Sequence, residues 1–169
     1  LRSGIGEISN INTVHKENIP FAEVKATNEE LLTIAGIEGQ KGYTRTALLG
    51  LIAAKEALAC SGIEEMKEFR TGLISATSVG GMDRSEHFYK DFLKDNNKGK
   101  LEDVVTHDCG ESTEKIADYL AIKDFVTTIS TACSSSANSI MLGARMIRSG
   151  LIDRVIAGGT DSLTKFTLN

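Results

Sequence analysis

The sequence predicts an α/β fold in which a mixed, mostly parallel sheet is flanked by helices, and two observations carry this prediction. Near the end of the chain, the β-branched segment 124–131 precedes a helix-like run that ends at Gly150, and the apolar segment 153–162 follows. A strand, a helix and a strand in this order form a βαβ unit, which requires parallel strands and a right-handed crossover. Earlier, a helical pattern at 44–61 precedes a strand-like run at 70–78. We expect one domain over residues 1–169, because this length supports one core.

The residue pattern of the first half of the chain predicts a loop region, a helix and a buried strand, in this order. Residues 1–42 are mixed in character and contain glycines, so we expect a loop with short extended pieces. A helix is predicted from Thr44 to Ser61, with Gly62 as its left-handed C-terminal cap. The run 70–78 reads as a buried strand that the pair Gly80-Gly81 closes.

The middle of the chain predicts two further helices around a polar segment. One helix is expected from Asp83 to Lys94, and the polar segment 95–110 is expected to be a loop or an excursion over the surface. The next helix is expected from 112, with Ser112 or Thr113 as its N-cap. The βαβ unit at 124–162 then completes the chain.

Composition and charge exclude several classes of function. A net charge of -4, a pI near 5.4 and 5% aromatic residues provide neither the basic surface nor the stacking side chains that nucleic-acid binding needs. The apolar stretches are of strand length or are interrupted by charges, so we expect no membrane span. Cys60, Cys109 and Cys133 are odd in number and widely spaced, which predicts free thiols in a reducing compartment, the cytoplasm.

Cys133 stands where the strand 124–131 turns into the following helix. In parallel sheets, reactive groups gather at the carboxyl ends of strands, and the positive end of a helix favours a thiolate. A nucleophile is therefore one interpretation of Cys133. The other interpretation is structural, because free cysteines are often buried as small apolar residues. The neighbouring serines, Ser134 to Ser136, are small enough to admit a substrate, and we expect them to cap the helix.

The letters around Cys133 favour the first interpretation. "STACSSSANSIMLGARMIRSG", followed by "DRVIAGGTDSLTKFT", closely resembles the active-site region of the β-ketoacyl-acyl carrier protein synthases, the elongating condensing enzymes. "ALLGLIAAKEALACSGI" and "ISATSVGGM" are similar to earlier parts of the same family. The resemblance implies a thiolase-like layered fold, of which this chain is the N-terminal half.

The resemblance also implies a reaction. An acyl chain would move from the phosphopantetheine arm of an acyl carrier protein to Cys133, and malonyl-carrier protein would then lose carbon dioxide and attack the acyl-cysteine in a Claisen condensation. No other cofactor and no metal is implied. The product would be a fatty acid, a polyketide or a related chain.

The histidines of the family's active site would lie beyond Asn169, so we expect the isolated fragment to be inactive and its sheet to be incomplete. The chain begins with Leu1 instead of a start methionine, which also suggests a piece of a longer protein. His15, His87 and His107 are expected to be ordinary surface histidines. His107, Asp108 and Cys109 are too few and poorly spaced for a metal site.

Partners follow from the same resemblance. Lys41 and Arg45 stand near the family's docking position for the acidic carrier protein, although both also read as ordinary solvated charges. A homodimer, or a heterodimer of two ketosynthase-like chains, is expected. Met82 lines an acyl tunnel or fills the core, and Cys60 is expected to be a packing residue on its helix.

Two alternative functions remain. In the first alternative, the chain is a non-catalytic scaffold, either truncated or similar to a chain length factor. Chain length factors lack the cysteine, whereas Cys133 is present in this chain. In the second it is a redox thiol protein, for which the chain has no Cys-x-x-Cys pair.

Overall fold

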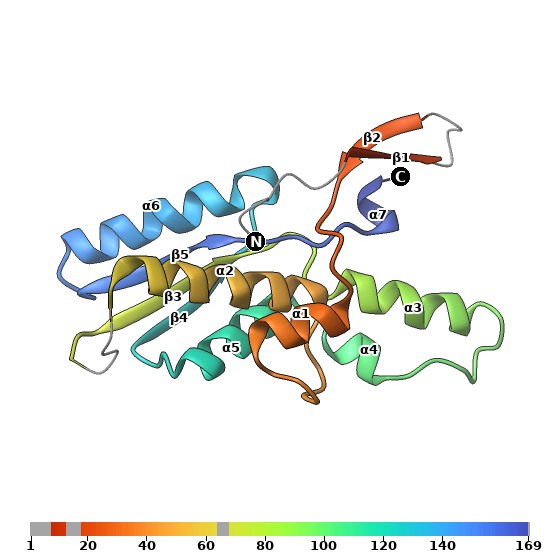
Figure 1. Ribbon diagram of the computed structural model, residues 1–169, viewed down its shortest axis with the longest axis horizontal. Helices are drawn as coiled ribbons and strands as arrows, with labels where there is room; N and C mark the ends of the chain where they lie inside the picture. Colours follow the sequence, from red (N-terminus) through yellow and green to blue (C-terminus); the bar gives the residue numbers. More distant parts are fainter. Residues whose placement is uncertain (1–7, 13–17, 64–67, 169) are drawn as a thin grey trace.

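The computed structural model describes residues 8–12, 18–63 and 68–168, and it confirms the α/β class. Its main sheet has three parallel strands in the order β4-β3-β5, which are β4 (Phe125–Ile129), β3 (Thr71–Ala76) and β5 (Arg154–Gly159). The register aligns Ile74 of β3 with Thr127 on one side and Ala157 on the other. The carboxyl ends of all three strands therefore lie at the same end of the sheet (Figure 1).

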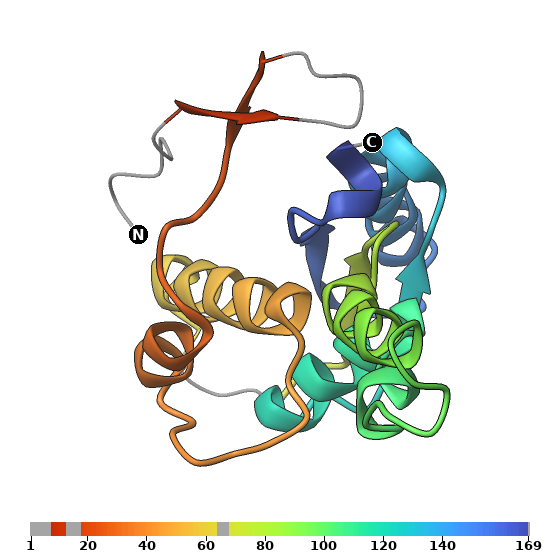
Figure 2. The same ribbon diagram turned by 90° about the vertical axis from the view of Figure 1, so that its right-hand side faces the viewer.

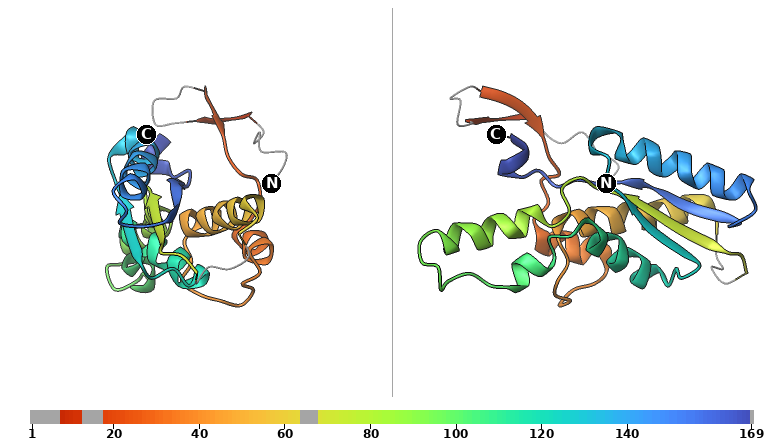
Figure 3. Two further views of the ribbon diagram at one scale, coloured as in Figure 1. Left: turned by 90° about the vertical axis from the view of Figure 1, so that its left-hand side faces the viewer. Right: turned by 180° about the vertical axis from the view of Figure 1, so that it is seen from behind.

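Helices cover both faces of this sheet. The helix α6 (Ser135–Arg148) packs against all three strands on one face. On the other face, α5 (Cys109–Leu120) contacts β3 and β4, while α2 (Arg45–Ser61) contacts α5 and β5. Figures 2 and 3 show these three layers from the two ends of the molecule and from behind. The predicted βαβ crossover is β4-α6-β5.

The helix α2 confirms the strongest helix prediction, including both ends. The Thr44 hydroxyl accepts a hydrogen bond from the Ala47 amide at 3.1 Å, which is an N-cap. Gly62 ends the helix with φ 69°, a conformation that costs glycine little. Because the apolar residues recur at helical spacing, Leu48 and Leu51 are buried together.

The central strand β3 divides the apolar core into two parts. All six of its residues are buried, as expected for a strand covered on both faces. Successive side chains point to opposite faces, so Leu73 packs with Leu48, Leu51 and Ile116, whereas Ile74 packs with Met146 and Ile152.

The prediction of a loop over residues 1–42 was incomplete. The expected short extended pieces are β1 (Ile8–Asn12) and β2 (Asn18–Ala22), an antiparallel pair that stands away from the main body (Figure 2). The helix α1 (Asn28–Ala35) was missed. It is held by a capping box, in which Thr27 and Glu30 each bind the other's backbone amide. The Thr-x-x-Glu spacing was the signal for it.

The segment 95–110 is mostly exposed, which fits the predicted excursion over the surface, but it is not a loop throughout. After α3 (Met82–Phe92), which was predicted almost to the residue, the chain forms the short helix α4 (Glu102–Val105). The helix α5 then begins at Cys109, capped by the Asp108 carboxylate, which accepts from the Gly110 amide at 2.6 Å. Ser112 and Thr113 are not caps. They are buried inside α5, where Thr113 accepts a hydrogen bond from Thr128 of β4 at 2.7 Å.

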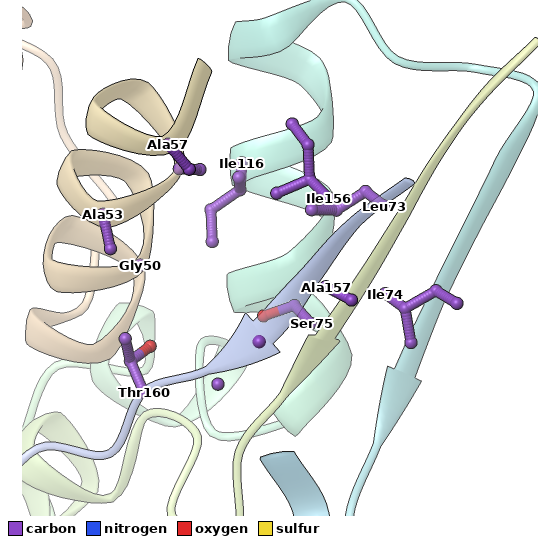
Figure 4. A pocket seen from close by; sticks show the side chains of 13 residues that line it. Gly50, Ala53, Ala57, Leu73, Ile74, Ser75, Ile116, Ile156, Ala157 and Thr160 are labelled. Carbon is purple, nitrogen blue, oxygen red and sulfur yellow. The ribbon is translucent and has the colours of Figure 1, made fainter. Parts of the chain in front are cut away.

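Four further features complete the fold. A cavity of about 110 Å³ lies between α2 and the sheet, and its lining is small and apolar with no ionisable side chain (Figure 4). Over the described ranges, no helix is long and apolar enough to cross a membrane. The chain ends in the short helix α7 (Lys165–Leu168). Within these ranges β4 and β5 are the sheet edges, and the incomplete sheet stays a prediction.

Candidate active site

Cys133 lies at the carboxyl end of β4, where the sequence placed it. After β4 the chain forms one turn of 3-10 helix, η1 (Ala132–Ser134), and α6 begins at Ser135. The thiol is free and exposed. A free thiol at the start of a helix, beside the carboxyl ends of parallel strands, is placed as a nucleophile requires.

The residue before Cys133 has an unusual backbone. Ala132 adopts φ 51°, the left-handed region that residues with a side chain seldom occupy. This conformation costs energy and persists only where neighbouring groups enforce it. The turn that carries Cys133 is therefore held in place by its surroundings.

The hydroxyl groups around Cys133 provide part of that constraint. Ser135 donates to the Ala132 carbonyl at 2.7 Å and accepts from the Thr131 amide at 2.8 Å. Ser134 donates to the Thr131 carbonyl at 2.7 Å, and the Asn138 amide group donates to the Thr131 hydroxyl at 2.8 Å. The expectation that these serines cap α6 was wrong, because Ser134 makes no side-chain cap. They bind the turn before the helix instead.

A second constraint comes from the ends of β3 and β5. Asp161 follows β5, and one of its oxygens accepts hydrogen bonds from the Thr77 hydroxyl at 2.6 Å and the Ser78 amide at 2.9 Å. The Ser78 hydroxyl lies 3.1 Å from the Ala132 carbonyl oxygen. These residues follow three different strands and meet only because the strands are parallel and in register. No role was predicted for Asp161 from the sequence.

Of the pairs Gly80-Gly81 and Gly158-Gly159, only the second permits a close backbone approach beside Cys133. A Cβ on Gly159 would lie 2.5 Å from the Ser136 hydroxyl, beside the cysteine turn. A Cβ on Gly81 would instead lie 1.9 Å from the Thr106 carbonyl oxygen, and one on Gly80 would meet His107. The absence of side chains at Gly80 and Gly81 therefore allows the backbone of the segment before α5 to pack closely against them.

Of the remaining candidates, Cys109 lies beside the thiol's turn, because its Sγ is 4.0 Å from the Ser130 hydroxyl oxygen. Cys60 is exposed on α2, Cys109 is the first residue of α5, and Met82 is half-buried at the start of α3. His87 is exposed, and the exposed His107 ring bonds Ser85 at 2.9 Å, whereas His15 lies outside the described residues. No cluster of three metal-ligating side chains occurs in the described part of the chain.

The two predicted docking cations differ in what they contact. The Arg45 guanidinium donates to the Val24 and Ala26 carbonyls and to the Asn28 side chain at 3.0 Å, so its charged end binds the segment before α1. Lys41 is exposed in the segment before α2. Arg45 thus has a structural role within the chain.

Comparison with known proteins assigns the family. The family model described as "Beta-ketoacyl synthase, N-terminal domain" matches residues 23–167. The chain belongs to the β-ketoacyl synthase family. Within this β-ketoacyl synthase domain, the match includes Cys133, Asp161 and all of the main sheet.

Known relatives extend the comparison. Nodulation protein E of Rhizobium meliloti is 26% identical over 163 residues, which cover 95% of this chain and 40% of the relative. The tetracenomycin polyketide synthase ketoacyl synthase alpha subunit of Streptomyces glaucescens is 28% identical over 138 residues, covering 71% and 30%. The solved complex of the ketosynthase ApeO with its chain length factor ApeC, from Xenorhabdus doucetiae, matches with TM-score 0.70 and 25% identity, covering 98% of this chain and 41% of that one. The β-ketoacyl synthase domain described here thus spans less than half of these relatives, and it shares the thiolase-like ketosynthase fold.

Proposed function

We propose that the protein is a β-ketoacyl-acyl carrier protein synthase and that Cys133 is its nucleophile. One observation carries the proposal: in a chain of the β-ketoacyl synthase family, an exposed free thiol stands at the turn between β4 and α6. A structural cysteine would be expected to be buried, and Cys133 is not. One relative is named as the ketoacyl synthase alpha subunit of a polyketide synthase, which supports carbon-chain extension as the reaction class.

The first proposed step is acyl transfer. The Cys133 thiolate attacks the thioester carbonyl of an acyl chain on the carrier protein's phosphopantetheine arm, a new sulfur-acyl bond forms, and the pantetheine sulfur leaves and takes up a proton. Ser134 leaves the first-turn amides of α6 without a side-chain cap, so these amides are suited to stabilise the transient oxyanion. No other cofactor is needed for this step.

The second proposed step forms the carbon-carbon bond. Malonyl-carrier protein loses carbon dioxide, and the resulting carbanion attacks the acyl-Cys133 carbonyl, so that the cysteine leaves as thiolate and the β-ketoacyl product stays on the carrier protein. In the family, histidines assist this decarboxylation. Neither His87 nor His107 lies on the turn that carries Cys133, so groups for this step come from outside the described residues.

The proposed partners are an acyl carrier protein and a second ketosynthase-like chain. The exposed Lys41 is the candidate contact for the acidic carrier protein, since Arg45 is bound within the chain. A ketosynthase and its chain length factor form the solved complex that this chain resembles, which supports a heterodimer, and a homodimer remains the alternative arrangement. Free thiols support a cytoplasmic location.

The test is covalent capture of an acyl group in the protein expressed from its complete gene. Incubation with an acyl-carrier protein should add one acyl group to the peptide that holds Cys133, as mass spectrometry would show, and Cys133→Ala should abolish this. The matched control is Cys60→Ala, which removes an equally exposed thiol on α2 and should leave acylation intact. Product formation by a Cys133→Ala protein would refute the nucleophile, and an inert Cys133 would favour the non-catalytic scaffold.

A further inference from the structure

The side chain of Asp161 connects the end of β5 with the turn that follows β3. A single carboxylate oxygen accepts three hydrogen bonds, from the Thr77 hydroxyl at 2.6 Å, the Ser78 amide at 2.9 Å and the Val79 amide at 3.2 Å. Multiple donors on one charged acceptor make a strong and directional contact. The conformation of residues 77–79 is therefore tied to the position of Asp161.

The same turn is also bound from within. The Thr77 hydroxyl, while donating to Asp161, accepts from the Gly80 amide at 3.0 Å, and Thr77 is 2% exposed. The Thr77 amide donates to the Ile129 carbonyl at 3.2 Å, which joins the turn to the end of β4. Ser78 and Asp161 are exposed, but Thr77 is buried and its hydroxyl both donates and accepts, so this part of the turn holds one geometry.

Ser78 carries this constraint to the cysteine turn. Its hydroxyl lies 3.1 Å from the Ala132 carbonyl oxygen and 3.2 Å from the Ser135 hydroxyl, so it can donate its proton to either. The Ala132 carbonyl belongs to the peptide bond that leads into Cys133, and Ala132 is the residue with φ 51°. The orientation of that peptide bond determines where the Cys133 side chain begins.

We propose that Asp161 is a positioning residue for Cys133, acting through Ser78 on the Ala132-Cys133 peptide bond; this inference rests on the proposed nucleophilic role of Cys133. Without the Asp161 oxygen, Ser78 loses its anchor and the left-handed Ala132 relaxes toward commoner conformations. The sulfur then moves from the position that the η1 turn gives it immediately before α6. Asp161 does not touch the reacting atoms in this account, so its effect is geometric.

The experiment compares the alkylation rate of Cys133 by iodoacetamide with that of Cys60 in the same molecule, peptide by peptide. Asp161→Ala should lower the Cys133 to Cys60 ratio by about tenfold, the factor expected when one well-bonded acceptor is lost. Asp161→Asn keeps an oxygen acceptor at the same place and should restore most of the ratio. Ser78→Ala should resemble Asp161→Ala, and the double variant should be no slower than either single variant, because both act along one path.

The matched control is Asp153→Ala. Asp153 immediately precedes β5 and also accepts from a backbone amide, that of Arg70 at 2.9 Å, but it lies at the opposite end of the strand. The inference would be overturned if Asp153→Ala lowered the alkylation ratio as much as Asp161→Ala does. It would also be overturned if Asp161→Ala left the ratio unchanged. The inference would also be overturned if Asp161→Asn lowered the ratio of Cys133 to Cys60 alkylation as much as Asp161→Ala does.

Acyl capture separates this inference from the proposed function. In Asp161→Ala the maximal rate of acylation should fall in step with alkylation, while the carrier-protein concentration at half-maximal rate stays the same. A wild-type protein that is never acylated refutes the proposed function alone, because the alkylation ratio still measures the position of the thiol. Normal acylation in Asp161→Ala, with wild type acylated, would refute the positioning role.

Discussion

The two ends of the sheet each contain an aspartate that fastens β5 to β3, but the partners differ. At the amino end, Asp153 pairs with the Arg70 guanidinium at 2.7 Å and accepts from the Arg70 amide. At the carboxyl end, Asp161 accepts from a hydroxyl and two backbone amides. The first contact is an ion pair, and the second is an anion held by neutral donors.

Exposure explains what this difference means. The Arg70 and Asp153 side chains are 53% and 38% exposed, so water and salt weaken their attraction, and such pairs contribute little to stability. The groups around Asp161 include buried Thr77 and Val79 and lead to buried Ser135. Hydrogen bonds from neutral donors depend less on salt than an ion pair does, and the network around buried Thr77 holds a geometry, which suits the end of the sheet where the thiol stands.

The largest effect at the carboxyl end is expected from Gly81→Ala. A Cβ there would lie 1.9 Å from the Thr106 carbonyl oxygen, so the backbone before α5 must move, at a cost of about 3 kcal/mol or more. Urea unfolding would measure it. The matched control is Gly158→Ala, where a Cβ meets nothing within 4 Å and stability should change by no more than about 1 kcal/mol. Equal midpoints for the two variants would contradict the close approach.

An intermediate effect on stability is expected from substitutions at Ala132. Its left-handed backbone is strained and lies beside the carboxyl ends of the strands. Ala132→Val places a β-branched residue at φ 51° and should destabilise the protein by about 1–3 kcal/mol while slowing alkylation of Cys133. Ala132→Gly accepts that conformation and should stay close to wild type, because relief of strain offsets the extra entropy of the unfolded chain. A valine variant with wild-type stability and reactivity would show that the turn is not constrained.

The smallest effect is expected at the amino end, from Arg70→Ala. Hydrogen bonds from Arg70 lower the pKa of Asp153 from 3.8 to about 2. A carboxyl group with a lowered pKa stabilises the folded state above its ordinary pKa, and this contribution is lost as pH falls through about 2. Melting temperatures of Arg70→Ala and wild type should therefore differ slightly near neutral pH, less in high salt, and converge as pH falls from 4 to 2. A difference that grows on acidification would refute the ion pair's role.

Local signals in the sequence predicted most of the elements. Thr44 and Gly62 mark the ends of α2 because capping depends on a few neighbouring residues, and the β-branched run before Cys133 predicts β4 for the same reason. The helix α1 was missed although its Thr27-x-x-Glu30 box is local, because the helix is short and follows a mixed segment. The start of α5 was misplaced because Ser112 and Thr113 look like caps but are buried by contacts with distant residues.

The candidate site was predicted only in part. The string around Cys133 was enough to indicate the family, which the match to the family model confirms, whereas the nucleophilic role of Cys133 stays a prediction. Its neighbours Ser134 and Ser135 were assigned the wrong contacts, because whether a hydroxyl caps a helix or binds a carbonyl depends on backbone angles that the letters do not show. Arg45, a candidate docking residue, was likewise read as a surface charge. Its guanidinium instead donates hydrogen bonds to the Ala26 carbonyl and the Asn28 side chain.

What the sequence by itself determined about this protein is the order of its helices and strands, its family, and a cysteine at a strand-to-helix turn, because each depends on residues that are neighbours along the chain. Only the tertiary structure decided that Asp161, Ser78 and Ala132 meet. They follow three different strands, and hydrogen bonds between residues so far apart exist only once the parallel register of the sheet has brought the strand ends to one edge.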